Sequence, residues 1–219
     1  MSDIGLVWIR EDFRIENNAA LSYATQNHKN VIAFYIYNNN DYDNKREAQK
    51  WWLSKSLENF KKDLSNYKIN LQITKGDELE IFSKIKKKDN VSIYWNKIYE
   101  PDVISKGKKI RDLFIKNEIN FKYFKGNILN EFQEVTKNDK TPFKVFTPFW
   151  RTAEKIYLGL PPSKNYIVKK QSQIKSFFKN CINPNDILPK KNWHKKFENY
   201  WIVSENNSKK ILKNLIDNK

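Results

Sequence analysis

The sequence predicts an α/β protein: a Rossmann-like, doubly wound domain with a five-stranded parallel sheet, followed by a mostly helical or irregular C-terminal connector. Two observations lead to this fold class. Five short runs of β-branched and aromatic residues recur before Gly126, and segments with helical patterns lie between them. Strands that alternate with helices form a parallel sheet through right-handed crossovers, and the helices cover both faces. After Gly126 the alternation ends.

The elements follow one another in regular order. The first predicted strand is an apolar run that ends abruptly in the charged segment Arg10–Arg14, and an asparagine-led helix start follows. Asp77 stands directly before the third predicted helix, where an Asp side chain commonly caps the first turn. The predicted strands cover residues 4–9, 31–37, 69–74, 91–95 and 121–124, and the predicted helices cover 18–28, 46–67, 78–88 and 103–118.

The C-terminal part of the chain has a different pattern. Residues 136–145 are polar and turn-rich, and Thr147 and Pro148 then predict the N-cap and first residue of a helix near 148–157. Scattered prolines and isolated aromatics over 163–203 predict a connector that wraps a surface, with a short helix near 171–180. A final helix from about Asn206 would place four apolar residues on one stripe: Ile211, Leu212, Leu215 and Ile216.

Composition excludes several classes of protein. With 39% apolar and 15% aromatic residues, the 219-residue chain can bury a real core. It has no apolar run of about 18 residues, as a membrane-spanning helix needs, and its N-terminus has no secretory pattern. The single Cys181 excludes an internal disulfide, and with two histidines a Cys/His metal site is not expected. We therefore expect a cytoplasmic, metal-free protein. We also expect a monomer.

The net charge of +16 is unevenly distributed. Residues 1–135 carry 23 Lys and Arg against 19 Asp and Glu, whereas residues 136–219 carry 18 against 6. The basic excess in the second part is consistent with contact to a polyanion, and equally with a solvated surface in a chain rich in Lys, Asn and Ile. Both interpretations stay open.

The predicted sheet indicates where a ligand would bind. The chain lacks a GxGxxG fingerprint and a P-loop, so a dinucleotide enzyme of the usual Rossmann type is not expected. In open α/β sheets, ligands bind at the carboxyl ends of the strands, where the strand order reverses. With the order 3-2-1-4-5, the loops at that point are Arg10–Asn17 and Asn96–Asp102. We therefore predict a small-molecule crevice between them.

Several segments, in the right order, resemble motifs of the DNA photolyase/cryptochrome family. The most specific is Val145–Trp150, which is nearly identical to the family's Val-Phe-Thr-Pro-Phe connector motif. Ser204 stands where the family has glycine. The resemblance covers about residues 4–215, and its other carriers are Trp8–Arg14 with Asn18–Leu21, Arg46 with Trp51–Leu57, Gly76–Asp77, Trp95–Pro101 (Trp-Asn-x-x-Tyr-Glu-Pro), Leu188–Pro189, Trp193 and Trp201–Glu205.

The resemblance implies a domain organisation and a function. Residues 1–135 would be the light-harvesting antenna domain of a deoxyribodipyrimidine photolyase-like protein, 136–205 the interdomain connector, and 206–219 the start of an FAD-binding helical domain that the chain otherwise lacks. In the family an antenna chromophore, which is methenyltetrahydrofolate, a deazaflavin or FMN, passes excitation energy to FAD, and the reduced flavin splits pyrimidine dimers in flipped-out DNA. We expect this chain to bind the antenna chromophore but, without FAD and the helical domain, to carry no catalytic residue and no repair activity.

Carried over to this chain, the family's antenna pocket nominates Arg10, Phe34, Ile36, Lys45, Gln49, Leu53 and Glu100. Glu100 could accept a hydrogen bond from a flat heterocycle on which Tyr99 and Trp95 stack; alternatively, it only favours the start of the next helix and Trp95 is core. Arg10 or Lys45 could hold a carboxylate or phosphate, or be solvated charges. Lys45 and Gln49 rest on spacing alone.

Trp51 and Trp52 are adjacent on a predicted helix, so they point about 100° apart and only one can face the sheet fully. The other would border the crevice, or simply pack.

Two other classes of function remain alternatives. One is a stand-alone Rossmann-type protein that binds a flavin or nucleotide and has no light function. The other is a nucleic-acid-binding module that uses the basic residues 136–219 and binds with a steep dependence on salt. For the photolyase-like interpretation, the expected partners are the helical flavin domain and DNA, which this chain would bind weakly and without sequence preference.

Overall fold

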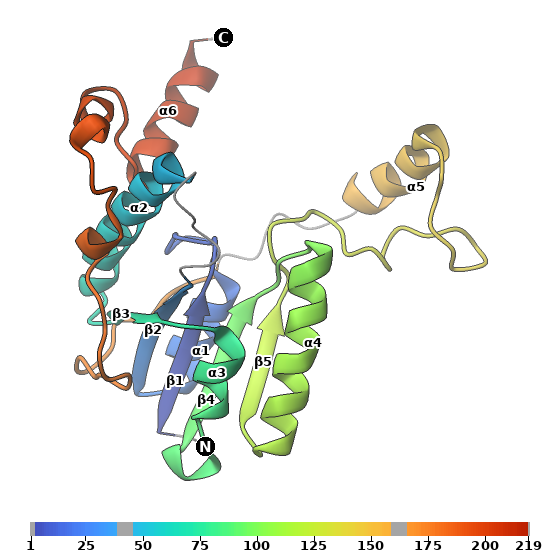
Figure 1. Ribbon diagram of the computed structural model, residues 1–219. Helices are drawn as coiled ribbons and strands as arrows, with labels where there is room; N and C mark the ends of the chain where they lie inside the picture. Colours follow the sequence, from blue (N-terminus) through green and yellow to red (C-terminus); the bar gives the residue numbers. More distant parts are fainter. Residues whose placement is uncertain (1–2, 39–45, 159–165, 219) are drawn as a thin grey trace.

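The computed structural model describes residues 3–38, 46–158 and 166–218. A five-stranded, all-parallel sheet forms its centre (Figure 1). The strands are β1 (Ile4–Ile9), β2 (Asn30–Tyr37), β3 (Asn70–Lys75), β4 (Val91–Asn96) and β5 (Asn120–Phe124), in the order β3-β2-β1-β4-β5. The predicted fold class and strand order are confirmed, with the order reversing between β1 and β4.

Alternate residues of the strands build a core on each face of the sheet. From β1, Val7 and Ile9 face a cluster that α1 (Ala19–Asn27) and α2 (Glu47–Ser65) cover, whereas Leu6 and Trp8 face a cluster under α3 (Glu78–Ser83) and α4 (Pro101–Lys116). All four β1 side chains are buried. A strand buried on both faces is typical of parallel sheets with helices on both sides.

The helix boundaries follow local capping signals. The Asn18 side chain accepts from the Leu21 N–H at 3.1 Å and so caps α1, and Asp77 caps α3 as predicted, accepting from the Leu79 N–H at 2.8 Å. The prediction of a helix to residue 88 is wrong, because α3 ends at Ser83 and the chain turns so that Ile85 enters the core. A short 3₁₀ segment, η2 (Lys87–Asp89), leads into β4.

The helix α5 (Phe146–Leu158) lies apart from the sheet, beyond α4 (Figure 1). It begins two residues before the predicted start, so Thr147 lies inside the helix rather than at its N-cap. Pro148 is still within the first turn, where its missing N–H leaves no intrahelical bond unmade.

The predicted short helix at 171–180 is wrong, since this segment runs in irregular, extended form beside β3. Its backbone is held by polar groups of the sheet edge. The Gln72 side-chain oxygen accepts from the N–H groups of Phe177 and Phe178, at 2.7 and 3.0 Å, and Ile182 forms an antiparallel bridge with Ile73. An edge strand offers unpaired backbone groups, and here Ile182 pairs with one of them, the backbone oxygen of Ile73.

The rest of the C-terminal segment contains η3 (Pro184–Ile187) and η4 (Asn192–Asn199), and the final helix α6 (Glu205–Asp217) begins close to the predicted position. Ser204 has extended backbone angles and its hydroxyl accepts from the Asn207 N–H at 3.2 Å. No left-handed residue is needed there, so serine serves as the helix cap in place of glycine. Across the described ranges, no helix is both long and apolar enough to cross a membrane.

Candidate functional site

A cleft of about 690 Å³ opens at the carboxyl ends of β1 and β2, beside the start of α4. This is the edge of the sheet where the sequence predicts a crevice. Its apolar and aromatic lining includes Trp8, Phe13, Tyr35, Ile36, Trp52, Leu53 and Ile110, and its polar lining includes Arg10, Gln49, Glu78, Glu100, Asp102 and Lys106. Such a mixture of aromatic walls and a few polar groups is typical of small-molecule sites, which usually measure roughly 300–1,000 Å³.

The cleft brings together most of the nominated residues. Five of the seven line it: Arg10, Ile36, Gln49, Leu53 and Glu100. Phe34 does not, because it lies two residues deeper in β2, is fully buried, and packs against the rings of Phe82 and Phe178. Lys45 falls outside the described residues. That any of them contacts a chromophore stays a prediction.

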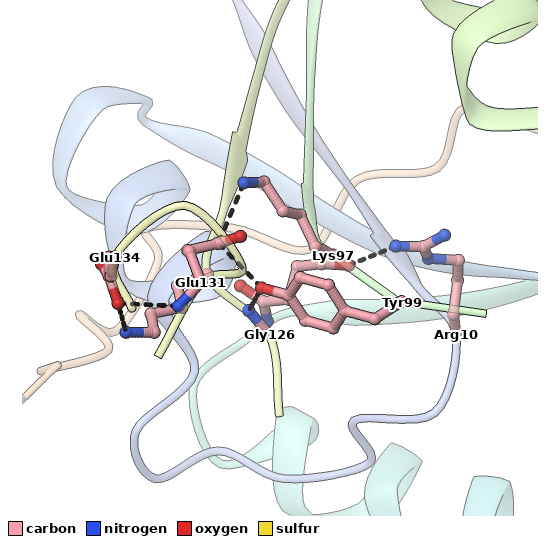
Figure 2. Close-up of polar contacts among 8 residues, drawn as sticks. Arg10, Lys97, Tyr99, Gly126, Glu131 and Glu134 are labelled. Atoms are coloured by element: carbon pink, nitrogen blue, oxygen red, sulfur yellow. Dashed lines mark hydrogen bonds and ion pairs between the residues drawn. The ribbon is translucent and has the colours of Figure 1, made fainter. Parts of the chain in front are cut away.

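Arg10 is the most deeply buried cation of the cleft lining. Its guanidinium lies over the Trp8 ring, 4.8 Å from the centroid, and its Nη2 donates to the backbone oxygen of Asn96 (Figure 2). Within the described ranges, the buried Nε has no hydrogen-bond partner. Burial lowers the pKa of Arg10, and the nearby carboxylate of Asp12 acts in the opposite direction. Arg10 thus places a guanidinium cation at the wall of the cleft.

Asn96, at the end of β4, joins the two loops of the switch point. Its amide nitrogen donates to the Asp12 carboxylate and to Asn18 Oδ1, the latter at 2.9 Å, and its amide oxygen accepts from the Ala20 N–H at 3.1 Å. Burial raises the pKa of Asp12, although the hydrogen bond from Asn96 opposes this. This junction was not among the predicted features, although a polar residue at the end of a buried strand was an available signal.

Tyr99 and Trp95 lie away from the cleft. The Tyr99 hydroxyl donates to Glu131 at 2.8 Å and accepts from the Gly126 N–H at 3.1 Å, while Lys97 pairs with Glu131 at 2.9 Å (Figure 2). Burial and the bond to Glu131 raise the pKa of Tyr99 to about 12, against the effect of the Gly126 bond. Trp95 is core, stacked on Phe121. The expectation that both stack on a ligand is therefore not met.

The tryptophan pair on α2 separates as expected. Trp51 is 2% exposed and packs against Phe197 of the connector, whereas Trp52 is 46% exposed and borders the cleft. Trp52 and Phe13 also border a second hollow of about 410 Å³ between α2 and α6. The aromatic residues that line the cleft are thus Trp8, Phe13, Tyr35 and Trp52.

Glu100 lies at the rim of the cleft, directly before Pro101 of α4. Its side chain is exposed and makes no capping hydrogen bond to the helix. Nearby, Lys106 pairs with Glu78 at 2.6 Å and with Asp77 at 3.3 Å. Among the described residues, no group of three or more His, Cys, Asp or Glu side chains could hold a metal ion.

Comparison with known proteins finds photolyases and cryptochromes. The family model described as DNA photolyase matches residues 5–168. The chain is 27% identical over 228 residues to a deoxyribodipyrimidine photo-lyase of Agrobacterium fabrum, covering 97% of this chain and 44% of that protein. It is 28% identical over 150 residues to cryptochrome-1 of Arabidopsis thaliana, covering 66% of this chain and 22% of that protein. The chain thus spans less than half the length of these relatives.

Solved structures share the fold. The bacterial class III photolyase of Agrobacterium tumefaciens matches with a TM-score of 0.81 and 24% identity, over 99% of this chain and 45% of that chain. The archaeal photolyase of Sulfolobus tokodaii, described with two FAD molecules, matches with a TM-score of 0.65 and 21% identity, over 84% of this chain and 40% of that chain. With a family model matched over most of its length, the chain belongs to the DNA photolyase family.

Proposed function

We propose that this chain is the light-harvesting part of a DNA photolyase-like protein and that its cleft binds a planar antenna chromophore. The observation that carries this proposal is the cleft itself. It lies at the carboxyl edge of the sheet, its volume of about 690 Å³ suits a flat heterocycle, and it gathers five of the nominated residues. The chromophore class is methenyltetrahydrofolate, a deazaflavin or FMN. The Sulfolobus relative, described as implying a novel light-harvesting cofactor, supports the proposal by analogy.

The lining residues suit distinct parts of such a ligand. Trp52 presents exposed aromatic surface against which a flat ring system packs, and the largely buried Trp8 and Tyr35 contribute to the wall beside it. The Arg10 guanidinium, which lines the cleft, donates to a carbonyl or anionic oxygen. Glu100, at the rim, accepts from a ring N–H or an exocyclic amine. When bound, such a chromophore would supply light absorption and transferable excitation energy, and the residues of the cleft would hold and orient it.

Binding is tested by adding methenyl-folate, FMN and a deazaflavin separately to the folded protein and following fluorescence and thermal shift. We expect at least one to bind and to raise the melting temperature. Glu100→Ala should weaken the binding free energy of that ligand by roughly 1.5–3 kcal/mol, the usual effect of losing a charge-assisted hydrogen bond. The control is Asp112→Ala, which removes an exposed carboxylate of α4 that does not line the cleft. A folded sample that responds to none of the three ligands contradicts the proposal.

We further propose that these 219 residues alone bind DNA weakly and do not repair it. The basic excess of residues 136–219 supports non-specific affinity, with a dissociation constant of about 10⁻⁴–10⁻⁶ M that rises with salt through counterion release. The test compares dimer-containing with undamaged duplex, in the dark and under blue light, with FAD supplied. Light-driven dimer splitting, or a strong preference for damaged DNA, would contradict this part of the proposal.

A further inference from the structure

The first residue of α6 holds the loop that lines the cleft. The Glu205 carboxylate accepts hydrogen bonds from the backbone N–H groups of Ile15 and Glu16, at 2.7 and 3.1 Å. Its side chain is 12% exposed and also pairs with Lys209, at 2.9 Å. Hydrogen bonds from N–H groups to a carboxylate are stronger than neutral ones. We call the Glu205 carboxylate with its two N–H donors the clasp.

The other side of the same loop faces the cleft. Arg10, Glu11 and Phe13 all line it. Phe13 packs against the rings of Tyr35 and Phe60, with centroids 5.8 and 6.2 Å away, and Ile15 packs against the same core cluster. Ile15 of the clasp is therefore only two residues from Phe13 of the cleft wall. Because both side chains pack against one core cluster, a shift of residues 15–16 would also move the wall.

Beyond its N-terminal end, α6 has little to hold it to the rest of the molecule. None of its residues is buried. Among the described residues, two further contacts lie at the same end: Lys209 pairs with Glu16 as well as with Glu205, and just before the helix the Asn59 side chain donates to the Val203 oxygen at 2.8 Å. The clasp is thus a principal link between α6 and the β1–α1 loop.

We propose that Glu205 is a positioning residue that couples the cleft to α6. With the clasp closed, the β1–α1 loop is fixed in the form that binds ligand, and a ligand in the cleft in turn holds α6 in place. Coupling between two sites is reciprocal, and a contiguous packed network with two arrangements carries it. Whatever draws α6 away from the body therefore weakens ligand binding without touching the cleft. The ligand half of this inference rests on the proposed function, whereas the clasp does not.

The first experiment tests the clasp without a ligand. Amide hydrogen exchange of Ile15 and Glu16, followed by NMR, is compared in the wild type, Glu205→Ala and Glu205→Gln, with circular dichroism as the check of folding. Loss of the carboxylate should speed exchange at both amides about tenfold or more, and the Gln variant should lie between, because it keeps one acceptor oxygen. The control Lys62→Ala breaks an exposed ion pair with Glu58 on α2 and should change neither amide. Unchanged exchange in both Glu205 variants overturns the clasp.

The second experiment tests the coupling. FMN, or methenyl-folate or a deazaflavin if FMN does not bind, is titrated into the same proteins and followed by fluorescence. The dissociation constant should rise about fivefold in Glu205→Ala, at the lower end of known couplings, and stay unchanged in Lys62→Ala. Saturating ligand should also slow exchange of the Ser208 amide, which closes the first turn of α6, in the wild type but not in Glu205→Ala. A residue that merely starts the helix would not give this ligand effect.

The outcomes separate the two claims. If no probe binds the wild type, the proposed function is contradicted and the coupling falls with it, while exchange at Ile15 and Glu16 still decides the clasp. If exchange at these amides rises but the dissociation constant does not change, the clasp exists and the coupling is overturned. If Glu205→Ala does not fold, the comparison is made with Glu205→Gln, for which an unchanged dissociation constant likewise overturns the coupling.

Discussion

The body of the molecule, up to residue 135, and its C-terminal segment, residues 166–218, are stabilised in different ways. In the body, β1, β2 and β4 are buried along nearly their whole length, and helices cover both faces. In the C-terminal segment, the irregular chain is held at polar positions such as Gln72 and Asn59, and α6 exposes its whole apolar stripe. Apolar burial fixes the first part, whereas the second is attached by separate hydrogen bonds and by a few apolar side chains, such as Val168 and Ile187, that enter the core of the body.

The difference shows where the two parts can change. Removing buried apolar surface destabilises a fold in proportion to the lost contacts and to the cavity left behind. Removing one hydrogen bond from an attached segment releases that segment locally, because stability is not uniform across a structure. A substitution in the body should therefore change the stability of the body as one cooperative unit. A substitution in the clasp should release only α6.

The largest expected effect comes from truncating a ring in the body. Phe114 is fully buried, with its ring 5.0 Å from that of Phe82 and 6.1 Å from that of Trp95. Phe114→Ala should lower the free energy of unfolding by about 3–5 kcal/mol. The matched change in α6, Leu215→Ala, should stay within about 0.5 kcal/mol, because Leu215 is 60% exposed. Urea denaturation measures both, and comparable losses would remove the distinction between the two parts.

Gly126 gives the next effect in size. A Cβ built there would lie 2.0 Å from the backbone oxygen of Lys97 and 3.2 Å from the Tyr99 ring, so the β5 exit loop must shift. Gly126→Ala should cost about 1–3 kcal/mol through overpacking. In Gly107→Ala the new Cβ meets only the end of the Arg111 side chain at 3.5 Å, so α4 should gain up to about 1 kcal/mol from alanine's helix propensity. A neutral Gly126→Ala would mean that this loop is not fixed against Lys97.

Local signals allowed much of this architecture to be predicted. The apolar runs gave the strands, and the charged ends of β1 and β4 marked the switch point, where five nominated residues line the cleft. The wrong predictions concern segments whose conformation depends on polar partners that are distant in sequence. The segment 171–180 loses its helix to hydrogen bonds with Gln72, about 100 residues away, and nothing near Glu205 in sequence indicates its bonds to Ile15 and Glu16. Tyr99 is drawn from the cleft by Glu131.

The pH dependence of stability should also differ between the two parts. Burial raises the pKa of Asp12 in the body, so the folded state keeps a proton that the unfolded state has lost. Asp12 therefore makes the protein less stable as pH rises from about 4, the unfolded value, through its raised folded pKa. In the C-terminal segment, Lys55 lowers the pKa of the exposed Glu198, and the small stabilisation that results is lost as pH falls through this lowered value.

Urea denaturation of the wild type, Asp12→Asn and Glu198→Gln between pH 4 and 8 measures this contrast. The stability of Asp12→Asn relative to the wild type should increase as pH rises, since the variant carries no buried charge. The stability of Glu198→Gln should change with pH in the same way as that of the wild type above about pH 5, because an exposed ion pair contributes little. An Asp12→Asn curve parallel to that of the wild type would show that Asp12 titrates as in the unfolded chain.

The smallest effect is the stability of α6 itself, which hydrogen exchange can resolve. The helix has 13 residues, buries none of them, and leaves Ile211, Leu212, Leu215 and Ile216 each more than half exposed. Isolated helices shorter than roughly 12–15 residues are marginal in water. Beyond the first turn held by the clasp, its amides should exchange nearly as fast as in a free peptide. The amides of β1 should be strongly protected, and so should those of α2, a helix that buries seven side chains. Exchange in α6 as slow as in β1 would mean that packing holds this helix too, and the contrast between burial and attachment would no longer apply.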